Sequence, residues 1–323
     1  MRRANGNGLG LEGEKGMKEV TPSYYKKFKC IGSQCKHSCC IGWEIDIDGD
    51  TAKKYEKVGG VFGKRLRDCI DKSGECPHFI LGDKERCPFL NKNNLCDIII
   101  NLGESYLCEI CDAHPRFKNY FSDRVEIGIG LCCEEACRII LENDEPFSFE
   151  ISENTEPCGE LSEYEMETIV DRDGILFMLT DRNLPIEERI KRIITLDLPN
   201  CTLNKWAEYL LSLEILSDEW RALLESAKGI KSPLTHFGYE KELEALMCYF
   251  VYRYVLNEDY DGKTHTVIAF SLLCSRIITT LWSEFAETEE DKTEICRLFS
   301  QEIEYSTENV SSLMSLIEEY NEI

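Results

Sequence analysis

Cysteine is the residue type in this sequence whose spacing could do chemistry, because its thiolate binds soft metals and can act as a nucleophile. The chain holds 18 cysteines in 323 residues, and thirteen of them lie between Cys30 and Cys137. Ten of these thirteen form four blocks: Cys30-x4-Cys35-x3-Cys39-Cys40, then Cys87 with Cys96, then Cys108-x2-Cys111, and finally Cys132-Cys133. Four thiol blocks within about a hundred residues indicate a metal site, since thiolates on loops can converge on one centre.

Disulfides are the other common reason for such cysteine density, and they belong to oxidising compartments. We find no signal peptide in the sequence: Arg2 and Arg3 are not followed by an apolar run. No stretch approaches the roughly 20 apolar residues that span a bilayer. We therefore expect a cytoplasmic protein without a transmembrane segment, in which the thiols stay reduced and bind metal.

The spacing of the thiols favours an iron–sulfur cluster over zinc. Structural zinc usually takes paired C-x2-C knuckles, and only Cys108 and Cys111 have that spacing. Uneven spacings, with more thiols than one tetrahedral site can use, suit an iron–sulfur cluster better. The C-x3-C-x2-C pattern of radical-SAM enzymes fails because Gly42 stands three residues after Cys39. Gly59 to Lys64 matches no nucleotide-binding loop and is predicted to be a turn.

The net charge of −23 argues against nucleic acid as a partner, because phosphate binding needs a basic surface. Either the acidic residues form a solvated surface, or an acidic cleft attracts substrates that carry lysine.

Hydrophobic periodicity divides the chain into two predicted domains, of the α+β class overall. Residues 1–16 are expected to be an extension or a cloning remnant, and residues 17–142 a cysteine-rich iron–sulfur domain with short strands. Residues 143–161 form a polar linker, and 162–323 an α-helical domain. A loop-rich first half would draw much of its order from the metal.

The individual elements follow from periodicity and capping signals. Alternation predicts strands at Trp43–Asp48 and Val125–Leu131, and Ser162 with Glu165 forms a capping box. The predicted helices are Thr51–Lys57, Ile98–Leu102, Glu134–Leu141, one opened by Pro185, Asn204–Lys228, Glu240–Leu256, His265–Phe285, Asp291–Tyr305 and a short Val310–Tyr320.

The blocks together resemble a known family. The segment Phe28-Lys29-Cys30-Ile31-Gly32, continuing through Cys35, Cys39-Cys40 and Gly42-Trp43 to Asp48, resembles the opening of the flagellin lysine-N-methylase family. Arg86 to Asn91, Leu95 to Ile98, and Leu102 to Cys111 resemble its later blocks, and Tyr252-Arg253-Tyr254 resembles its helical half. The resemblance covers most of the chain from Met17.

The resemblance implies a methyltransferase that uses S-adenosylmethionine (SAM) to methylate the ε-amino groups of flagellin lysines, with a [4Fe-4S] cluster. No familiar SAM-binding loop is present, so the catalytic residues and the lysine-activating base stay unassigned. The chemistry requires a deprotonated lysine amine in line with the sulfonium methyl group.

The resemblance to the family also indicates which cysteines are expected to be metal ligands and which are additional. Cys133 stands at the familiar position, whereas Cys132 and Cys137 are additions, and His114 replaces a more usual aromatic residue. The predicted metal ligands are Cys30, Cys35, Cys39, Cys40, Cys87, Cys96, Cys108, Cys111 and Cys133. Whether they serve one centre or two is open, but a vicinal pair rarely supplies both ligands to one iron.

Other residues have one functional and one structural interpretation. Arg116 is the candidate for binding the SAM carboxylate, or else pairs with a neighbouring acid. Trp43 is expected in the core, His37 in a solvated loop, and Tyr252 to Tyr254 at the domain interface. Cys158, Cys201, Cys248, Cys274 and Cys296 are expected to be small apolar residues in helical segments.

Two rival functions remain from the sequence. In one, the thiols hold a structural zinc and the helical half binds a partner. In the other, the protein is a redox sensor or cluster carrier with a labile cluster.

Overall fold

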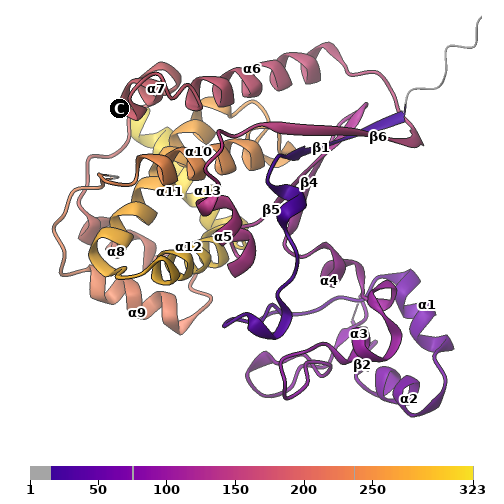
Figure 1. Cartoon of the computed structure of the whole chain (residues 1–323). Helices are drawn as coiled ribbons and strands as arrows, with labels where there is room; N and C mark the ends of the chain where they lie inside the picture. The colour runs from indigo at the N-terminus through magenta and orange to yellow at the C-terminus, as the bar shows by residue number, and fades with distance from the viewer. Residues whose placement is uncertain (1–15, 75, 236, 323) are drawn as a thin grey trace, which may run out of the picture.

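The structure, a computed structural model, describes residues 16–74, 76–235 and 237–322, so the predicted extension lies outside the described residues except for Gly16. The chain forms two lobes, which Figure 1 shows side by side. The small lobe holds α1 (Gly49–Lys57), α2 (Gly60–Asp68), β2 (Ile70–Asp71), β3 (His78–Phe79), α3 (Asp97–Leu102) and α4 (Glu109–Ala113).

The large lobe combines a sheet with helices. Its strands are β1 (Gly16–Pro22), β4 (Arg116–Tyr120), β5 (Arg124–Ile129) and β6 (Phe149–Pro157). Its helices are α5 (Glu134–Glu142), α6 (Glu163–Leu179), α7 (Ile186–Ile193), α8 (Leu203–Leu210), α9 (Asp218–Ala227), α10 (Glu240–Tyr254), α11 (Thr264–Phe285), α12 (Glu289–Ile303) and α13 (Thr307–Asn321). The predicted mixture of strands and helices is therefore confirmed.

The sheet has the order β4-β5-β1-β6, with β1 parallel to β5 and antiparallel to β6. The β4–β5 hairpin confirms the strand predicted at Val125–Leu131. Strand β6 lies inside residues 143–161, which were predicted to be a linker, and its pairing with β1 makes it a sheet edge. The polar sequence of β6 predicts a loop because residues 151–157 of this edge strand are exposed on both faces.

Helix α10 packs against this sheet, and two cores result. The Tyr252 hydroxyl donates to the carbonyl of Val20 at 2.9 Å, which confirms the predicted packing of Tyr252 to Tyr254 at an interface. Residues of β5, α5 and the later helices share one hydrophobic core, while residues from Ile45 to Cys108 form a smaller, separate one. Residues on both sides of the predicted linker thus share the larger core.

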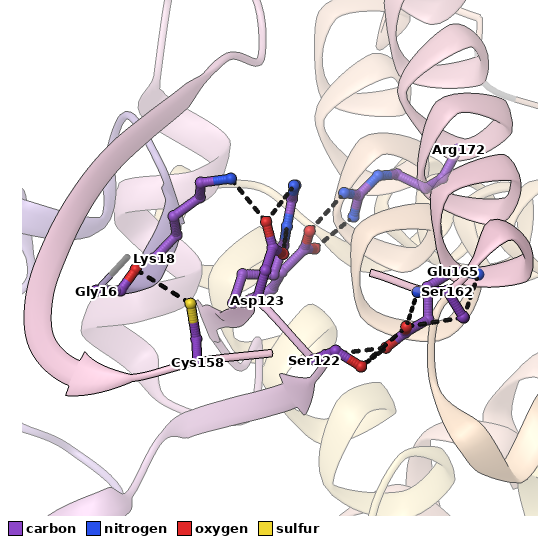
Figure 2. Close-up of polar contacts among 10 residues, drawn as sticks. Gly16, Lys18, Ser122, Asp123, Cys158, Ser162, Glu165 and Arg172 are labelled. Atoms are coloured by element: carbon purple, nitrogen blue, oxygen red, sulfur yellow. Dashed lines mark hydrogen bonds and ion pairs between the residues drawn. The ribbon is translucent and has the colours of Figure 1, made fainter. Parts of the chain in front are cut away.

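Polar contacts fasten α6 to the β4–β5 hairpin: Glu165 accepts hydrogen bonds from Ser122, and Arg172 pairs with Glu126 of β5 (Figure 2). Asp123 binds Lys18 of β1 at 2.6 Å, and Ser162 caps α6 with Glu165 in the predicted capping box.

Several predicted elements were wrong in detail. Trp43–Asp48 is not a strand; Asp46 makes an isolated bridge to His78, although Ile45 and Ile47 are buried. Gly59 to Lys64 is not a turn, because helix α2 begins at Gly60.

The helix predicted over Asn204–Lys228 is two helices, α8 and α9. Ser217 accepts a hydrogen bond from the Trp220 amide and so starts α9 afresh. The last helix, α13, is longer than predicted.

The expectation that no stretch is long and apolar enough to span a bilayer was wrong for helix α11. It is 22 residues long and meets that test by length and composition, but 89% of its apolar window is buried inside the fold. Such burial is typical of the core helix of a folded domain.

Candidate metal centre

Five of the nine predicted ligands lie in the small lobe, around its buried core. The amide of Cys87 donates to the carbonyl of Cys40 at 2.9 Å, and Leu90 pairs with Cys96 in an isolated bridge. The amide of Cys111 donates to the carbonyl of Cys108 at 3.0 Å, which places these two on one turn. We call the five the small-lobe thiol group: Cys40, Cys87, Cys96, Cys108 and Cys111.

Electrostatic interactions connect these five sulfur atoms. Burial raises the pKa of the Cys87 thiol to about 12, and the Cys40 and Cys96 thiols raise this pKa as well. The pKa of Cys111 is also raised, first by its hydrogen bond to Cys108 and further by Cys40 and Cys87. Such mutual repulsion among thiolates is what a bound cation would relieve.

In each of two hydrogen-bonded cysteine pairs, one thiol has a lowered pKa and therefore ionises more readily. A hydrogen bond from Cys39 lowers the pKa of Cys40 to about 7, and one from Cys111 lowers the pKa of Cys108. The thiolate is the form of cysteine that binds metal.

Short helices supply further donors to the sulfur atoms. Cys96 caps the N-terminus of α3, Cys108 that of α4, and Cys133 that of α5. Backbone amides of Ile98 and Ile99 oppose the effect of burial on the pKa of Cys96. Helix N-termini stabilise negative charge, so the amides offset part of the burial that raises the pKa of Cys96 and of Cys133.

The loop that carries Cys35 and Cys39 docks against the large lobe instead. The amide of Lys36 donates to the Glu134 carboxylate at 2.9 Å, and its ammonium group contacts Glu290 at 2.5 Å. His37 Nε2 lies 3.1 Å from the carboxylate of Glu294, so this loop histidine, 43% exposed, pairs with α12. These contacts bring the loop to the N-terminal ends of α5 and α12.

The docking brings this loop to Cys133, the first residue before α5. Burial raises the pKa of Cys35 to about 12, and the thiols of Cys133 and Cys30 raise it as well. The hydrogen bond with Cys40 and burial raise the pKa of Cys39 most, and the thiols of Cys30 and Cys133 raise it further. We call these four the interlobe thiol group: Cys30, Cys35, Cys39 and Cys133.

The donor set fits a thiolate-bound iron–sulfur cluster. Both groups offer at least four free thiols, which is the ligand number of such a cluster. Four thiolates are also the ligand set of a tetrahedral zinc ion.

The remaining candidates have other contacts. Cys132 Sγ lies 3.0 Å from the Tyr305 hydroxyl, and Cys137 Sγ contacts the Thr293 carbonyl at 3.7 Å. Cys248, Cys274 and Cys296 are buried in helices, as expected, whereas Cys158 and Cys201 lie outside helices.

Arg116 and Trp43 lie near the junction of the lobes. Arg116 Nε donates to the Tyr25 hydroxyl at 2.9 Å and Nη1 to the carbonyl of Asp112 at 3.2 Å. The ring of Trp43 lies 6.1 Å from that of His114; Trp43 is half-buried and not in the core, so that expectation was wrong. Burial lowers the pKa of His114 to about 4.

Sequence reasoning missed the three glutamates that hold the loop, Glu134, Glu290 and Glu294. They stand about one hundred or more positions from it, among 60 acidic residues, so no local signal distinguishes them.

Three oxygen and nitrogen ligands also lie close together, at Glu44, Asp46 and His78. Two of the three are exposed, and acidic surface groups of this kind are common without an ion.

The fold and the thiols define a class: a mixed α/β protein of two lobes whose candidate ligands gather into two groups. Comparison with known proteins narrows that class. The chain is 30% identical to the lysine-N-methylase of Salmonella typhimurium, over an alignment that covers 43% of this chain and 36% of the relative. The Salmonella choleraesuis lysine-N-methylase gives the same figures, and the flagellar biosynthetic protein FliU of Salmonella muenchen is 28% identical over 39% of this chain and 80% of that protein.

These similarities confirm the resemblance to the flagellin lysine-N-methylase family. The matched region spans only about a third of the length of the two lysine-N-methylases. No protein-family model matches the chain, and no solved structure matches it.

Proposed function

We propose that the protein is a SAM-dependent protein-lysine N-methyltransferase that acts in the cytoplasm on flagellin lysines and depends on a [4Fe-4S] cluster. The observation that carries this proposal is the similarity to curated lysine-N-methylases. The names of those relatives supply the reaction, and the name of the flagellar relative supports the substrate.

The interlobe thiol group is the site we assign to the cluster. Its four thiols come from the Cys30–Cys39 loop and from the start of α5, so they can close around one centre between the lobes. A bound cluster would supply a redox-active centre at this junction.

Acidic side chains beside this group favour a lysine substrate. Glu290 of α12 already holds the ammonium group of Lys36 at 2.5 Å, and Glu134 and Glu294 flank the same loop. With a net charge of −23, the surface attracts cationic partners. A lysine must lose its proton before it attacks the methyl group, so the reactive amine must leave water or meet a base.

Arg116 is the candidate contact for the SAM carboxylate. Its guanidinium group lies 5.4 Å from the centre of the Phe28 ring and is oriented by the Tyr25 hydroxyl. A guanidinium fork held in this way suits a carboxylate, which it can bind with two parallel hydrogen bonds.

The test uses anaerobically purified protein incubated with SAM and flagellin. Mass spectrometry should show flagellin gaining multiples of one methyl mass on lysines, and flagellin with its lysines changed to arginine should gain none. No gain with the cluster intact would contradict the proposal for this substrate.

The metal is tested separately, through colour and metal analysis. A brown protein that absorbs near 400 nm, about where iron–sulfur proteins generally absorb, supports the cluster. A colourless protein with stoichiometric zinc would favour the structural-zinc alternative.

A further inference from the structure

The peptide bond between Cys39 and Cys40 lies where the two thiol groups meet. The Cys40 carbonyl accepts the Cys87 amide at 2.9 Å, inside the small lobe. Four residues before Cys40, Lys36 is fixed to Glu134 and Glu290 of the large lobe. The backbone therefore crosses from one lobe to the other at this vicinal pair.

The small-lobe thiols and Cys133 of the interlobe group also pack against different hydrophobic cores. Cys87 and Cys108 are buried members of the small-lobe core, and Cys40, Cys96 and Cys111 pack against it. Cys133 packs against the large core, beside α5. Cys133 and the small-lobe thiols could share one centre only if one of these two cores were unpacked.

The number of thiols leads to the same division. One tetrahedral ion or one cubane cluster takes four thiolates, whereas nine candidates gather here, four in one group and five in the other. Cysteines close in sequence do divide between centres elsewhere: in two-cluster ferredoxins, the fourth cysteine of a run ligates the other cluster.

We propose that the small-lobe thiol group forms a second metal centre, separate from the centre held by the interlobe thiol group, with the vicinal pair divided between them. Cys39 serves the interlobe centre and Cys40 the small-lobe centre. The second centre takes a thiophilic metal, as iron–sulfur or as zinc, and holds the small lobe together. It does not depend on methyl transfer, because it is defined by metal content alone.

Native mass spectrometry of the whole protein, reconstituted anaerobically with iron and sulfide or with zinc, tests the proposal first. Two separate metal increments are expected on each molecule, and their masses distinguish a second cluster from a zinc ion. A single increment at saturation would overturn the proposal.

Two variants then assign the centres. Cys35→Ser leaves the interlobe group with three thiols, so it should lose one increment and keep the other. The double variant Cys96→Ser/Cys108→Ser leaves the small-lobe group with three, so it should lose the opposite increment. Cys201→Ser, an exposed thiol outside both groups, should keep both.

The result that would contradict two centres is the loss of all metal in a single variant. If either variant loses all metal while circular dichroism shows its helices retained, the nine thiols serve one centre and the proposal is wrong. Should the double variant fail to fold, the increment count of the unaltered protein still decides. None of these measurements uses SAM or flagellin, so a failed methylation assay leaves the result unaffected.

Discussion

Glu126 of β5 and Arg172 of α6 form a bidentate ion pair in which each side chain is only 1% exposed. Their two hydrogen bonds measure 2.7 and 2.9 Å. The same guanidinium group lies 5.0 Å from the centre of the Phe149 ring of β6 and 5.1 Å from that of Tyr252 of α10. One side chain thus connects two strands with two helices.

Removing one partner of this pair should destabilise the protein strongly, because the other charge is left buried and unpaired. We expect Glu126→Gln to lower the free energy of unfolding by about 3–5 kcal/mol, measured by urea denaturation. The control is Glu150→Gln, which breaks the exposed pair with Lys26 and should leave the free energy of unfolding almost unchanged. Equal losses in the two variants would contradict the structural role of the buried pair.

Gly128 lies opposite Phe117 in the β4–β5 hairpin, and a Cβ atom there would come within 2.1 Å of the ring. The ring cannot retreat easily, since the Arg253 guanidinium lies 4.9 Å from its centre. Gly128→Ala should therefore cost about 1–3 kcal/mol of stability through overpacking.

Gly174 of α6 provides the matched control for Gly128, because nothing lies within 4 Å of its added Cβ. Gly174→Ala should stabilise the protein by roughly 0.5–1 kcal/mol through helix propensity. If thermal denaturation shows the same change for both variants, the close approach of Phe117 to Gly128 is wrong.

Glu165 should make stability depend on pH. The Ser162 amide, assisted by the Ser122 amide, lowers the pKa of Glu165 from its ordinary 4.5 to about 2. A carboxylate whose pKa is depressed on folding stabilises the protein above the unfolded pKa, and this contribution fades as the pH falls from about 4.5 toward 2.

The measurement compares the urea midpoints of the unaltered protein and Glu165→Gln. The unaltered protein should be the more stable at pH 7, and the difference should shrink at pH 3. A difference that is constant between these pH values would show that the Glu165 charge does not contribute.

Removing metal should loosen the small lobe first, since its core is small and its thiols repel one another when no cation is bound. Hydrogen exchange after anaerobic chelation should show faster exchange in residues 40–111, with α10 and α11 still protected. Uniform exchange across both lobes, or none, would contradict separate cores.

Local signals in the sequence located most helices correctly. The capping box at Ser162 and the apolar periodicity of residues 240–256 are short-range features, and α6 and α10 form where they indicate. The strand β6 escaped prediction because its order comes from β1, more than 120 positions away. Likewise, the helix predicted across 204–228 is interrupted at Ser217. The Ser217 hydroxyl donates a hydrogen bond to the Glu302 carboxylate of α12, a contact between residues distant in sequence.

By itself, the sequence determined that this is a thiol-rich, acidic protein, that nine cysteines are candidate ligands, and which family it resembles. Residue type and spacing along the chain carry all of these. Only the tertiary structure decided that Cys133 joins Cys30, Cys35 and Cys39, while Cys40 faces Cys87. That division depends on ion pairs and backbone hydrogen bonds between residues distant in sequence, which hold Cys40 against the small core and bring the Cys35 loop to Cys133 at the large core.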